Sequence, residues 1–323
     1  MEILKKLLSF DTVCIQCHDN PDADSVAAAF GIWNYLQANG KQAQIIYGGA
    51  QIIQKPAMKL LISQCEIPIT HVTALPECDL LVMVDCQYGR GNVQQFAAPH
   101  LAVIDHHIPM QQQQGDTCIC PEFQSCCTLV WTLLREAGYP VAPESGLGIA
   151  LLYGLYTDTA AFVNLFKPAD CAMRDALHRC QPLFERLTKS NLTVEELLIA
   201  SDAMYHHWLD RKRHLAIVSA LRCDQTVLGV IGDFMIQVDA IDLSFCYTEQ
   251  EHGYQISLRS CSGQWPANEV AEFVCREIGH GGGHGDKAGG MIIKEKLQKV
   301  YPGQSIFEVL KTRLCRCLDT WGE

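Results

Sequence analysis

Short runs of continuously apolar residues alternate with helical runs over the first 190 residues of the chain. The expected strands are Thr12–Cys17, Ala43–Tyr47, Leu80–Val84 and Leu101–Ile104. A helix is expected from Ser25 until Gly40 ends its apolar face. Strands that are apolar throughout, rather than in alternation, are typical of sheets covered by helices on both faces. The pattern therefore predicts an α/β fold with a doubly wound, mainly parallel sheet.

Two domains joined by a helical linker are expected, with residues 1–190 as the first domain. The pattern changes around 191–215 to one long helix with a polar face, in which Thr193 and Glu196 have the spacing of a capping box. Residues 191–213 are thus interpreted as the linker, and residues 214–323 as a smaller α/β domain. Its expected strands lie near Leu215–Ser219, Val227–Ile231, Asp242–Tyr247 and Tyr254–Arg259. A helix over Pro266–Ile278 and a glycine-rich loop over 279–290 precede the last strand and the closing helix.

Composition excludes several classes of protein. The chain has 25 Lys+Arg and 36 Asp+Glu, a formal charge of −11, which argues against binding long nucleic acid through its phosphates. The longest run without a strongly polar side chain, 146–156, is far shorter than the roughly 20 residues of a membrane span. Lys5, Lys6 and Asp11 are unlike a signal peptide, and 17 cysteines without one indicate reduced thiols in the cytoplasm. The cysteine pairs lack the spacing of structural zinc sites; they are Cys118/Cys120, Cys126/Cys127 and Cys315/Cys317.

Acidic and imidazole side chains directly follow four separate apolar elements. The motif HDNPDADS, with His18, Asp22 and Asp24, follows the first strand. Single residues or short runs follow the other elements: Asp85 after LLVMV, Asp105-His106-His107 after LAVI, and Asp158 within GLYTDTAAF. In a parallel sheet, the carboxyl ends of the strands share one edge, so these side chains are expected to converge.

The charges in such a cluster decide what it holds. Four crowded carboxylates repel one another unless cations are present, and two divalent ions supply four positive charges. This balance fits a two-metal site of the kind that activates water for attack at phosphorus. Carboxylate and imidazole ligands without thiolate favour Mn²⁺, or Mg²⁺, Fe²⁺ or Co²⁺, over structural zinc.

The motifs HDNPDADS, VMVDCQ, VIDHH and YGLYTDTAAF resemble the four motifs of the DHH phosphoesterase superfamily. The later ISLRS and GHGGGH resemble the DHHA1 domain that follows it in one branch. That branch contains nanoRNases/pAp phosphatases, linear and cyclic dinucleotide phosphodiesterases, and single-strand exonuclease relatives. The resemblance implies a DHH-like metal-binding catalytic domain in residues 1–190 and a DHHA1-like substrate-binding domain in residues 214–323.

The resemblance also implies a role for each matched position. The implied metal ligands are His18, Asp22, Asp24, Asp85, His106 and Asp158. His18 and Asp22 would serve one ion, the other three residues would serve the second, and Asp85 would bridge the two. Two Mn²⁺ ions would then activate the attacking water.

Two further residues are implied to be catalytic. Asp105 would orient an imidazole through a ring N–H. His107 would lie beside the substrate phosphate and donate a hydrogen bond or a proton, although a purely structural histidine is the alternative.

The second domain is expected to grip the substrate. Arg259, on the polar face of its strand, can present a bidentate fork to phosphate oxygens. A glycine run without Cβ atoms lets backbone N–H groups approach an anion. The expected substrate-binding residues are Arg259, Ser260, Gly281, Gly282, Gly283 and His284. After TDTAAF the sequence departs from the family pattern, so only Asn164 and Lys167 could serve as its polar residues.

Together these features predict a metal-dependent phosphodiesterase/phosphatase that hydrolyses small phosphorylated nucleotides. Short oligoribonucleotides, pAp, and linear or cyclic dinucleotides are the expected substrates, and a homodimer is compatible with the resemblance. One alternative is an inorganic pyrophosphatase or polyphosphatase, against which ISLRS and GGGH argue. The other is a non-catalytic nucleotide-binding regulator, against which the six filled ligand positions argue.

Overall fold

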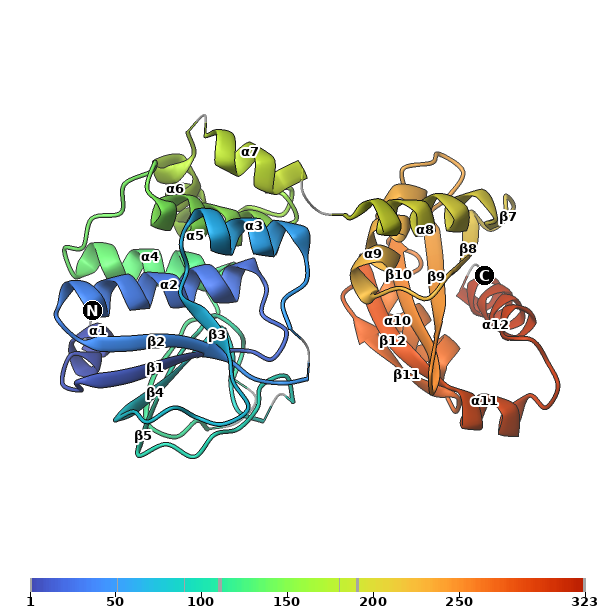
Figure 1. The fold of residues 1–323 in the computed structure, drawn as a ribbon. Coiled ribbons are helices and arrows are strands. Elements are labelled where there is room, and N and C mark those ends of the chain that lie inside the picture. The colour runs from blue at the N-terminus through green and yellow to red at the C-terminus, as the bar shows by residue number, and fades with distance from the viewer. Residues whose placement is uncertain are drawn as a thin grey trace. The chain divides into compact units, whose positions relative to one another are not determined.

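The computed structural model describes residues 2–50, 52–89, 91–109, 112–179, 181–189 and 192–321. The chain divides into two compact units, Met1–Asn191 and Leu192–Glu323, and each has its own sheet (Figure 1). Among the described residues, no helix has the length and apolar character that a membrane span requires.

The first unit is a parallel α/β domain. Its elements are α1 (Glu2–Leu7), β1 (Thr12–Cys17), α2 (Ala23–Ala38), β2 (Gln42–Tyr47), α3 (Pro56–Gln64), β3 (Ile69–His71), β4 (Leu80–Val84), β5 (His100–Asp105), β6 (Asp116–Ile119), α4 (Cys126–Glu136), α5 (Gly146–Asp158), α6 (Pro168–Leu177) and α7 (Pro182–Lys189). In the described part of this unit, six strands form one sheet in the order β3-β2-β1-β4-β5-β6, and every pair is parallel. The predicted parallel sheet is confirmed.

The strand order reverses between β1 and β4. From β1 the chain adds β2 and β3 on one side, and it then returns to add β4, β5 and β6 on the other. Ile15 of β1 accordingly lies between Ile45 of β2 and Val82 of β4. Such a reversal leaves a crevice outside the carboxyl ends of the two central strands, where ligands bind in open α/β sheets.

The two faces of this sheet are covered differently. The helices gather on one face, where α2 and α4 lie over the strands and α5 packs beyond them (Figure 1). The expectation of helices on both faces is wrong, because the connections 72–79 and 91–99 cover the second face without forming helices. Pro76 and Pro99 lack the N–H that a helix interior needs, and Gly91 adopts a left-handed φ of 76°.

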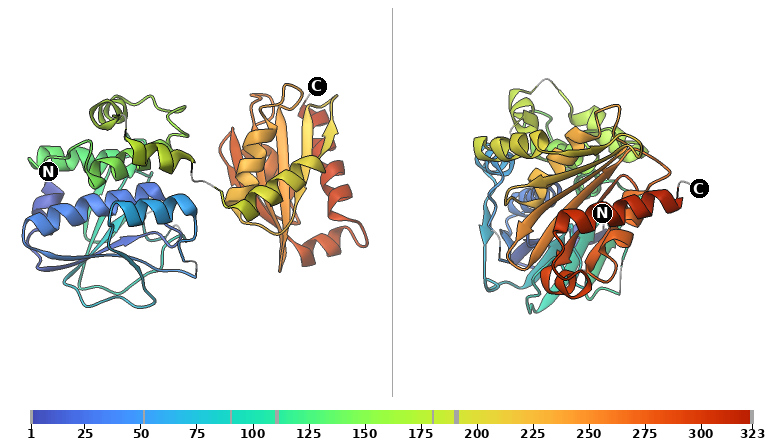
Figure 2. Two further views of the ribbon diagram at one scale, coloured as in Figure 1. Left: turned by 45° about the horizontal axis from the view of Figure 1, so that its top comes forward. Right: turned by 90° about the vertical axis from the view of Figure 1, so that its right-hand side faces the viewer.

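The second unit is a mixed α/β domain. Its elements are α8 (Val194–Tyr205), β7 (Trp208–Asp210), β8 (Leu215–Ala220), α9 (Gln225–Met235), β9 (Leu243–Gln250), β10 (Gly253–Ser260), α10 (Ala267–Cys275), β11 (Gly279–Gly283), β12 (Lys287–Ile293), α11 (Lys294–Val300) and α12 (Ile306–Trp321). The strands described in this unit lie in the order β11-β12-β10-β9-β8-β7, and only β8 and β9 pair in parallel. Helices α8 and α9 cover one face of the sheet, and α10 and α12 cover the other (Figure 2).

One predicted strand of this unit is wrong. Val227–Ile231 lies inside α9 and not in a strand. The Asp224 side chain caps this helix by accepting hydrogen bonds from Thr226 N at 2.8 Å and Val227 N at 3.0 Å. The cap satisfies N–H groups that would otherwise be unpaired, and it starts a helix whose apolar side chains pack on β8 and β9.

The expected single helix over 191–215 is also wrong. Asn191 lies outside the described residues, α8 covers only Val194–Tyr205, and strand β7 follows. The capping box of Thr193 and Glu196 is present at the start of α8. Ala200 and Ala203 are buried against α9 and β8, so α8 is part of the second unit.

The expected glycine-rich loop over 279–290 is two strands and a tight turn. Its glycines allow close packing, because a Cβ at Gly281 would lie 2.8 Å from Ala271 O of α10. A Cβ at Gly290 would lie 2.3 Å from His280 O of the neighbouring strand. These glycines are thus needed for strand pairing under a helix.

Candidate metal centre

Three ligand-bearing segments lie at the reversal of strand order in the first unit. His18 follows β1, Asp85 follows β4 and His106 follows β5, and these three strands are neighbours in the sheet. Asp85 has a φ of 60°, in the left-handed region that Asp and Asn adopt more readily than most residues. The backbone thus turns sharply at the place where this carboxylate enters the crevice.

Helix ends supply the remaining carboxylates. Asp22 is the N-cap of α2 and accepts a hydrogen bond from Ser25 N at 3.0 Å. Asp24, in the first turn of α2, is fully buried. Asp158 is the last residue of α5.

The side chains form two groups that meet at Asp85. In the first group, His18 Nε2 lies 3.7 Å from Asp22 Oδ1 and 3.9 Å from Asp85 Oδ2. In the second group, His106 Nε2 lies 3.8 Å from Asp24 Oδ2 and 3.5 Å from Asp158 Oδ2. It also lies 3.3 Å from Asp85 Oδ1. The structure therefore brings together all six residues expected to bind metal, with the two oxygens of Asp85 facing different groups.

The electrostatics of Asp85 are those of a site that needs a cation. Its side chain is 4% exposed, and Oδ1 is buried with no hydrogen-bond partner among the described residues. Burial raises the pKa of Asp85 well above its usual range, and the charges of Asp24, Asp22, Asp158 and Asp105 raise it further. The orphaned oxygen and the mixed oxygen and nitrogen donor set fit divalent metal ions.

The pKa values of two neighbouring carboxyl groups shift in opposite directions. Burial and the charge of Asp22 raise the pKa of Asp24, despite the opposing charge of His106. Burial acts to raise the pKa of Asp22 as well, but the hydrogen bond and charge of His18 outweigh it and lower that pKa. The surroundings thus favour the ionised form of Asp22 and disfavour that of Asp24 within one cluster.

Asp105 is fully buried and orients His107. Its Oδ1 accepts a hydrogen bond from His107 Nδ1 at 2.8 Å, and its Oδ2 accepts one from Gln87 Nε2 at 2.6 Å. Burial acts to raise the pKa of Asp105, but these hydrogen bonds outweigh it and lower that pKa. Asp105 therefore holds the imidazole of His107, whose side chain is 42% exposed. Gln87 was missed by the sequence analysis, although it lies within the quoted motif VMVDCQ.

Buried thiols lie next to the carboxylates, but the groups of described residues that could hold a metal ion contain no cysteine. Burial raises the pKa of Cys126 and of Cys127 well above the usual range, and the charges of Asp85 and Asp24 add to this. Their thiols donate to backbone carbonyls, Cys126 Sγ to Ile104 O at 3.5 Å and Cys127 Sγ to Asp24 O at 3.4 Å. Metal binding requires thiolate, which burial and the neighbouring carboxylates disfavour at both cysteines.

In the second unit, Arg259 is fixed by its own neighbours. Its Nε donates to Asp233 Oδ1, and Nη1 donates to Ser257 Oγ at 3.1 Å and Leu258 O at 2.9 Å. A Cβ at Gly229 of α9 would lie 2.8 Å from Arg259 Nη2, so this glycine makes room for the guanidinium. Within the described residues, Nη2 makes no hydrogen bond.

The other residues expected to bind substrate lie near the same end of β10. Ser260 Oγ donates to Trp265 O at 2.8 Å and so holds the local turn. Gly281, Gly282 and Gly283 belong to β11, whose end is opposite Ala288. His284 is exposed in the turn after β11, where its backbone N–H donates to Lys287 O at 2.7 Å.

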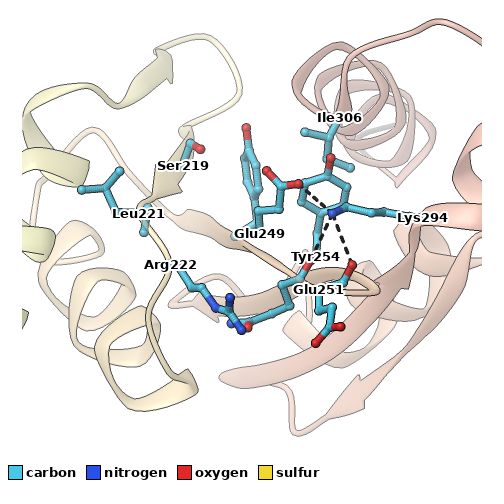
Figure 3. A pocket seen from close by; sticks show the side chains of 11 residues that line it. Ser219, Leu221, Arg222, Glu249, Glu251, Tyr254, Lys294 and Ile306 are labelled. Atoms are coloured by element: carbon cyan, nitrogen blue, oxygen red, sulfur yellow. Dashed lines mark hydrogen bonds and ion pairs between the residues drawn. The ribbon is translucent and has the colours of Figure 1, made fainter.

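A separate pocket of about 510 Å³ lies at the other end of this sheet (Figure 3). Tyr254 lines it, and at roughly 3.4 Å per residue along β10 it is about 17 Å from Arg259. Lys294 Nζ pairs with Glu249 Oε1 at 2.7 Å and donates to Gln250 O at 3.2 Å (Figure 3). The lysine in this pocket is thus already neutralised.

A parallel α/β unit that gathers carboxylates and imidazoles at its strand ends has the donor set of a metal-binding protein. Residues 12–155 match the model of the DHH family, N-terminal domain. The DHH resemblance predicted from the motifs of the first domain is therefore confirmed.

Relatives in the family are hydrolases of phosphoester or phosphoanhydride bonds. The cyclic-di-AMP phosphodiesterase GdpP of Geobacillus thermodenitrificans is 29% identical over 166 residues, which are 47% of this chain and 25% of that protein. A probable manganese-dependent inorganic pyrophosphatase of Staphylococcus aureus is 24% identical over 161 residues, 49% of this chain and 50% of that protein. The chain thus spans between a quarter and a half of the length of these relatives.

The fold of the whole chain has a solved counterpart. The crystal structure of an exopolyphosphatase-related protein from Bacteroides fragilis matches with a TM-score of 0.71 at 17% identity. The match covers 100% of this chain and 97% of that one. The two-unit α/β architecture is therefore shared.

Proposed function

We propose that this protein is a metal-dependent hydrolase of phosphoester bonds in small phosphorylated nucleotides, and that it uses two divalent ions, Mn²⁺ above all. The observation that carries this proposal is the position of Asp85. Its Oδ2 faces His18 and its Oδ1 faces His106, so one carboxylate serves both ligand groups. This arrangement suits a pair of ions bridged by one residue.

The ligands divide between two ions. His18, Asp22 and Asp85 would hold one ion, and Asp24, Asp85, His106 and Asp158 would hold the other. When bound, such ions activate water and neutralise negative charge on phosphate oxygens. The carboxylates keep this chemistry in one crevice because α2, β4 and α5 fix their positions.

His107 is the proposed proton-handling residue. Its Nδ1 is held by Asp105, which leaves Nε2 as the nitrogen that can meet a substrate oxygen. A proton on Nε2 can be donated to the leaving oxygen, and general acid catalysis of this kind contributes about 10²–10⁴-fold to a rate. Asp105 remains ionised to keep the ring in place.

We propose Arg259 and the turn at His284 as the phosphate-binding part of the second unit. Asp233 and Ser257 fix the guanidinium while Nη2 keeps its donors for a ligand. The net charge of −11 supports a small nucleotide over long nucleic acid. We also propose a homodimer, which size-exclusion chromatography with light scattering would test.

Two classes of substrate remain to be separated by experiment. The relative GdpP acts on cyclic di-AMP, which supports a dinucleotide substrate. The Staphylococcus aureus relative is a probable inorganic pyrophosphatase, which supports pyrophosphate as the second candidate.

The test is hydrolysis of a panel by protein stripped with chelator and reloaded with Mn²⁺. The panel holds pGpG, pApA, pAp, cyclic dinucleotides and pyrophosphate, with Asp85→Asn as the control. The proposal would be supported if wild type cleaves a nucleotide only with metal and Asp85→Asn does not cleave it. Cleavage of pyrophosphate alone would support the second candidate, and full activity in Asp85→Asn would refute the two-ion site.

A further inference from the structure

The five residues from Phe123 to Cys127, at the start of α4, contact two members of one ligand group and the chain segment that follows the third. We propose that this segment positions Asp24, His106 and Asp158 for a single ion, with Gln124 as its decisive side chain. The inference rests on the metal site of the proposed function and on no particular substrate. Sequence analysis assigned the segment no role.

Backbone groups of the segment hold two of the ligands. Phe123 O lies 3.4 Å from His106 Nδ1, which places the ring proton on that nitrogen and leaves a lone pair on Nε2 for a metal. Cys126 N and Cys127 N donate to the two oxygens of Asp24 at 2.7 and 2.8 Å. These N–H groups begin helix α4, and a helix N-terminus favours an ionised carboxylate.

The Gln124 side chain holds the chain that follows Asp158. Its Oε1 accepts hydrogen bonds from Phe166 N and Lys167 N, both at 2.8 Å. Its Nε2 donates to Asn164 O at 2.6 Å. The oxygen and the nitrogen of one amide therefore both hold the backbone that carries Asn164 and Lys167, the two polar residues expected after TDTAAF.

The segment between Asp158 and Asn164 needs such support because its backbone is strained. Ala160, Ala161 and Phe162 have φ values of 49°, 58° and 66°, three successive residues in the left-handed region. L-residues rarely adopt this region in succession. The Phe162 ring packs on Tyr156 at a centroid distance of 5.2 Å, and Gln124 secures the far end.

A buried carboxylate fixes Gln124 in turn. Asp170 of α6 is fully buried, and its two oxygens accept from Gln124 N at 3.2 and 3.1 Å. Within the described residues, the segment makes no hydrogen bond to His18 or Asp22. Loss of the Gln124 hydrogen bonds should therefore weaken the binding of one ion and leave the binding of the other unchanged.

The experiment measures Mn²⁺ binding by calorimetry on chelator-stripped protein. Wild type should bind two ions per chain, and Gln124→Ala should weaken one site by about tenfold or more while leaving the other within about twofold. Gln124→Glu keeps the acceptor for Phe166 N and Lys167 N, although it loses the donor to Asn164 O and adds a charge, so its loss of Mn²⁺ affinity should be smaller than that of Gln124→Ala. In a His18→Ala background, where the remaining site titrates, Gln124→Ala should again weaken binding.

Gln181→Ala is the matched control. Gln181 is a buried glutamine of the first unit, and its side-chain amide donates to Pro143 O and Leu177 O. Pro143 lies near the start of α5, about 20 Å of helix from Asp158. This variant should leave both Mn²⁺ sites unchanged.

Three results would overturn the inference: both sites unchanged in Gln124→Ala, both weakened equally, or the same loss in Gln181→Ala. If Gln124→Ala does not fold, unchanged binding by a folded Gln124→Glu overturns it as well. Wild type that binds two ions but cleaves no nucleotide would refute the proposed substrate and leave the positioning role intact.

Discussion

Replacing Asp85 by Asn should stabilise the metal-free protein. Asn has nearly the same shape and tolerates the left-handed backbone at this position, where φ is 60°. The change removes one charge from a cluster in which the ligand oxygens of Asp22 and Asp85 lie within 4.8 Å. Two ionised carboxylates about 5 Å apart repel by roughly 3 kcal/mol at an effective dielectric constant of about 20.

Burial raises the pKa of Asp85 well above its usual range, which favours its neutral form in metal-free wild type and so offsets part of this repulsion. We therefore expect a gain of about 1–3 kcal/mol in the free energy of unfolding at neutral pH. A gain of this size raises the Tm of a domain of this size by about 2–10 °C.

The difference in stability between Asp85→Asn and wild type should depend on pH. A carboxyl group with a raised pKa in the folded state stabilises the protein below its unfolded pKa, near 3.9, and loses that contribution as pH rises through the folded pKa. The advantage of Asp85→Asn should therefore vanish near pH 4 and grow toward neutral pH. Mn²⁺ should reverse the order, because ligand at about 100 times its Kd stabilises wild type by about 2.7 kcal/mol.

Thermal unfolding of both proteins, in chelator and in Mn²⁺ at several pH values, checks this crossing. A wild type that is already the more stable protein in chelator at neutral pH would refute the electrostatic argument. Equal stabilisation of both proteins by Mn²⁺ would show that Asp85 is not a ligand.

Three further substitutions test other parts of the site. Gly154→Ala should destabilise the protein by about 1–3 kcal/mol in urea denaturation, because the new Cβ would lie 2.4 Å from Cys127 Sγ and 3.0 Å from Asp24 Cα. His107→Gln should lower kcat by about 10²-fold or more while Mn²⁺ affinity stays within about twofold; loss of metal binding would make this residue a ligand instead. Arg259→Lys, which keeps the charge but loses the fork, should raise KM for a nucleotide without changing Mn²⁺ binding, and an unchanged KM would remove Arg259 from the substrate site.

The first sheet and the cluster at its edge were predictable because each signal was local. Continuous apolar runs indicated buried parallel strands, and His18, Asp85 and His106 each follow such a run directly. Parallel strands end at one edge, so topology alone brings these side chains together. The cover of the second face was not predictable in this way, since irregular connections also bury apolar strands.

The second unit shows where local signals fail. The apolar run Val227–Ile231 is short enough to suit either a strand or a helix, and only the cap at Asp224 decides for the helix. The glycines over 279–290 suggested a loop because glycine is common in loops. Glycine is needed at Gly281 because Ala271 of α10 approaches it closely. This tertiary contact cannot be predicted from the local sequence.

The segment from Phe123 to Cys127 shows a deeper reason why part of the site escapes the sequence. Phe123, Cys126 and Cys127 act on His106 and Asp24 through a carbonyl and two N–H groups, which every residue except proline possesses in full. Main-chain contacts of this kind leave no pattern in the sequence, and the adjacent cysteines instead invite a zinc interpretation, although their thiols donate to the backbone carbonyls of Ile104 and Asp24. Gln124 holds the residues after Asp158 through its side-chain amide, so substitution there separates the positioning of the ligands from the mere presence of a helix.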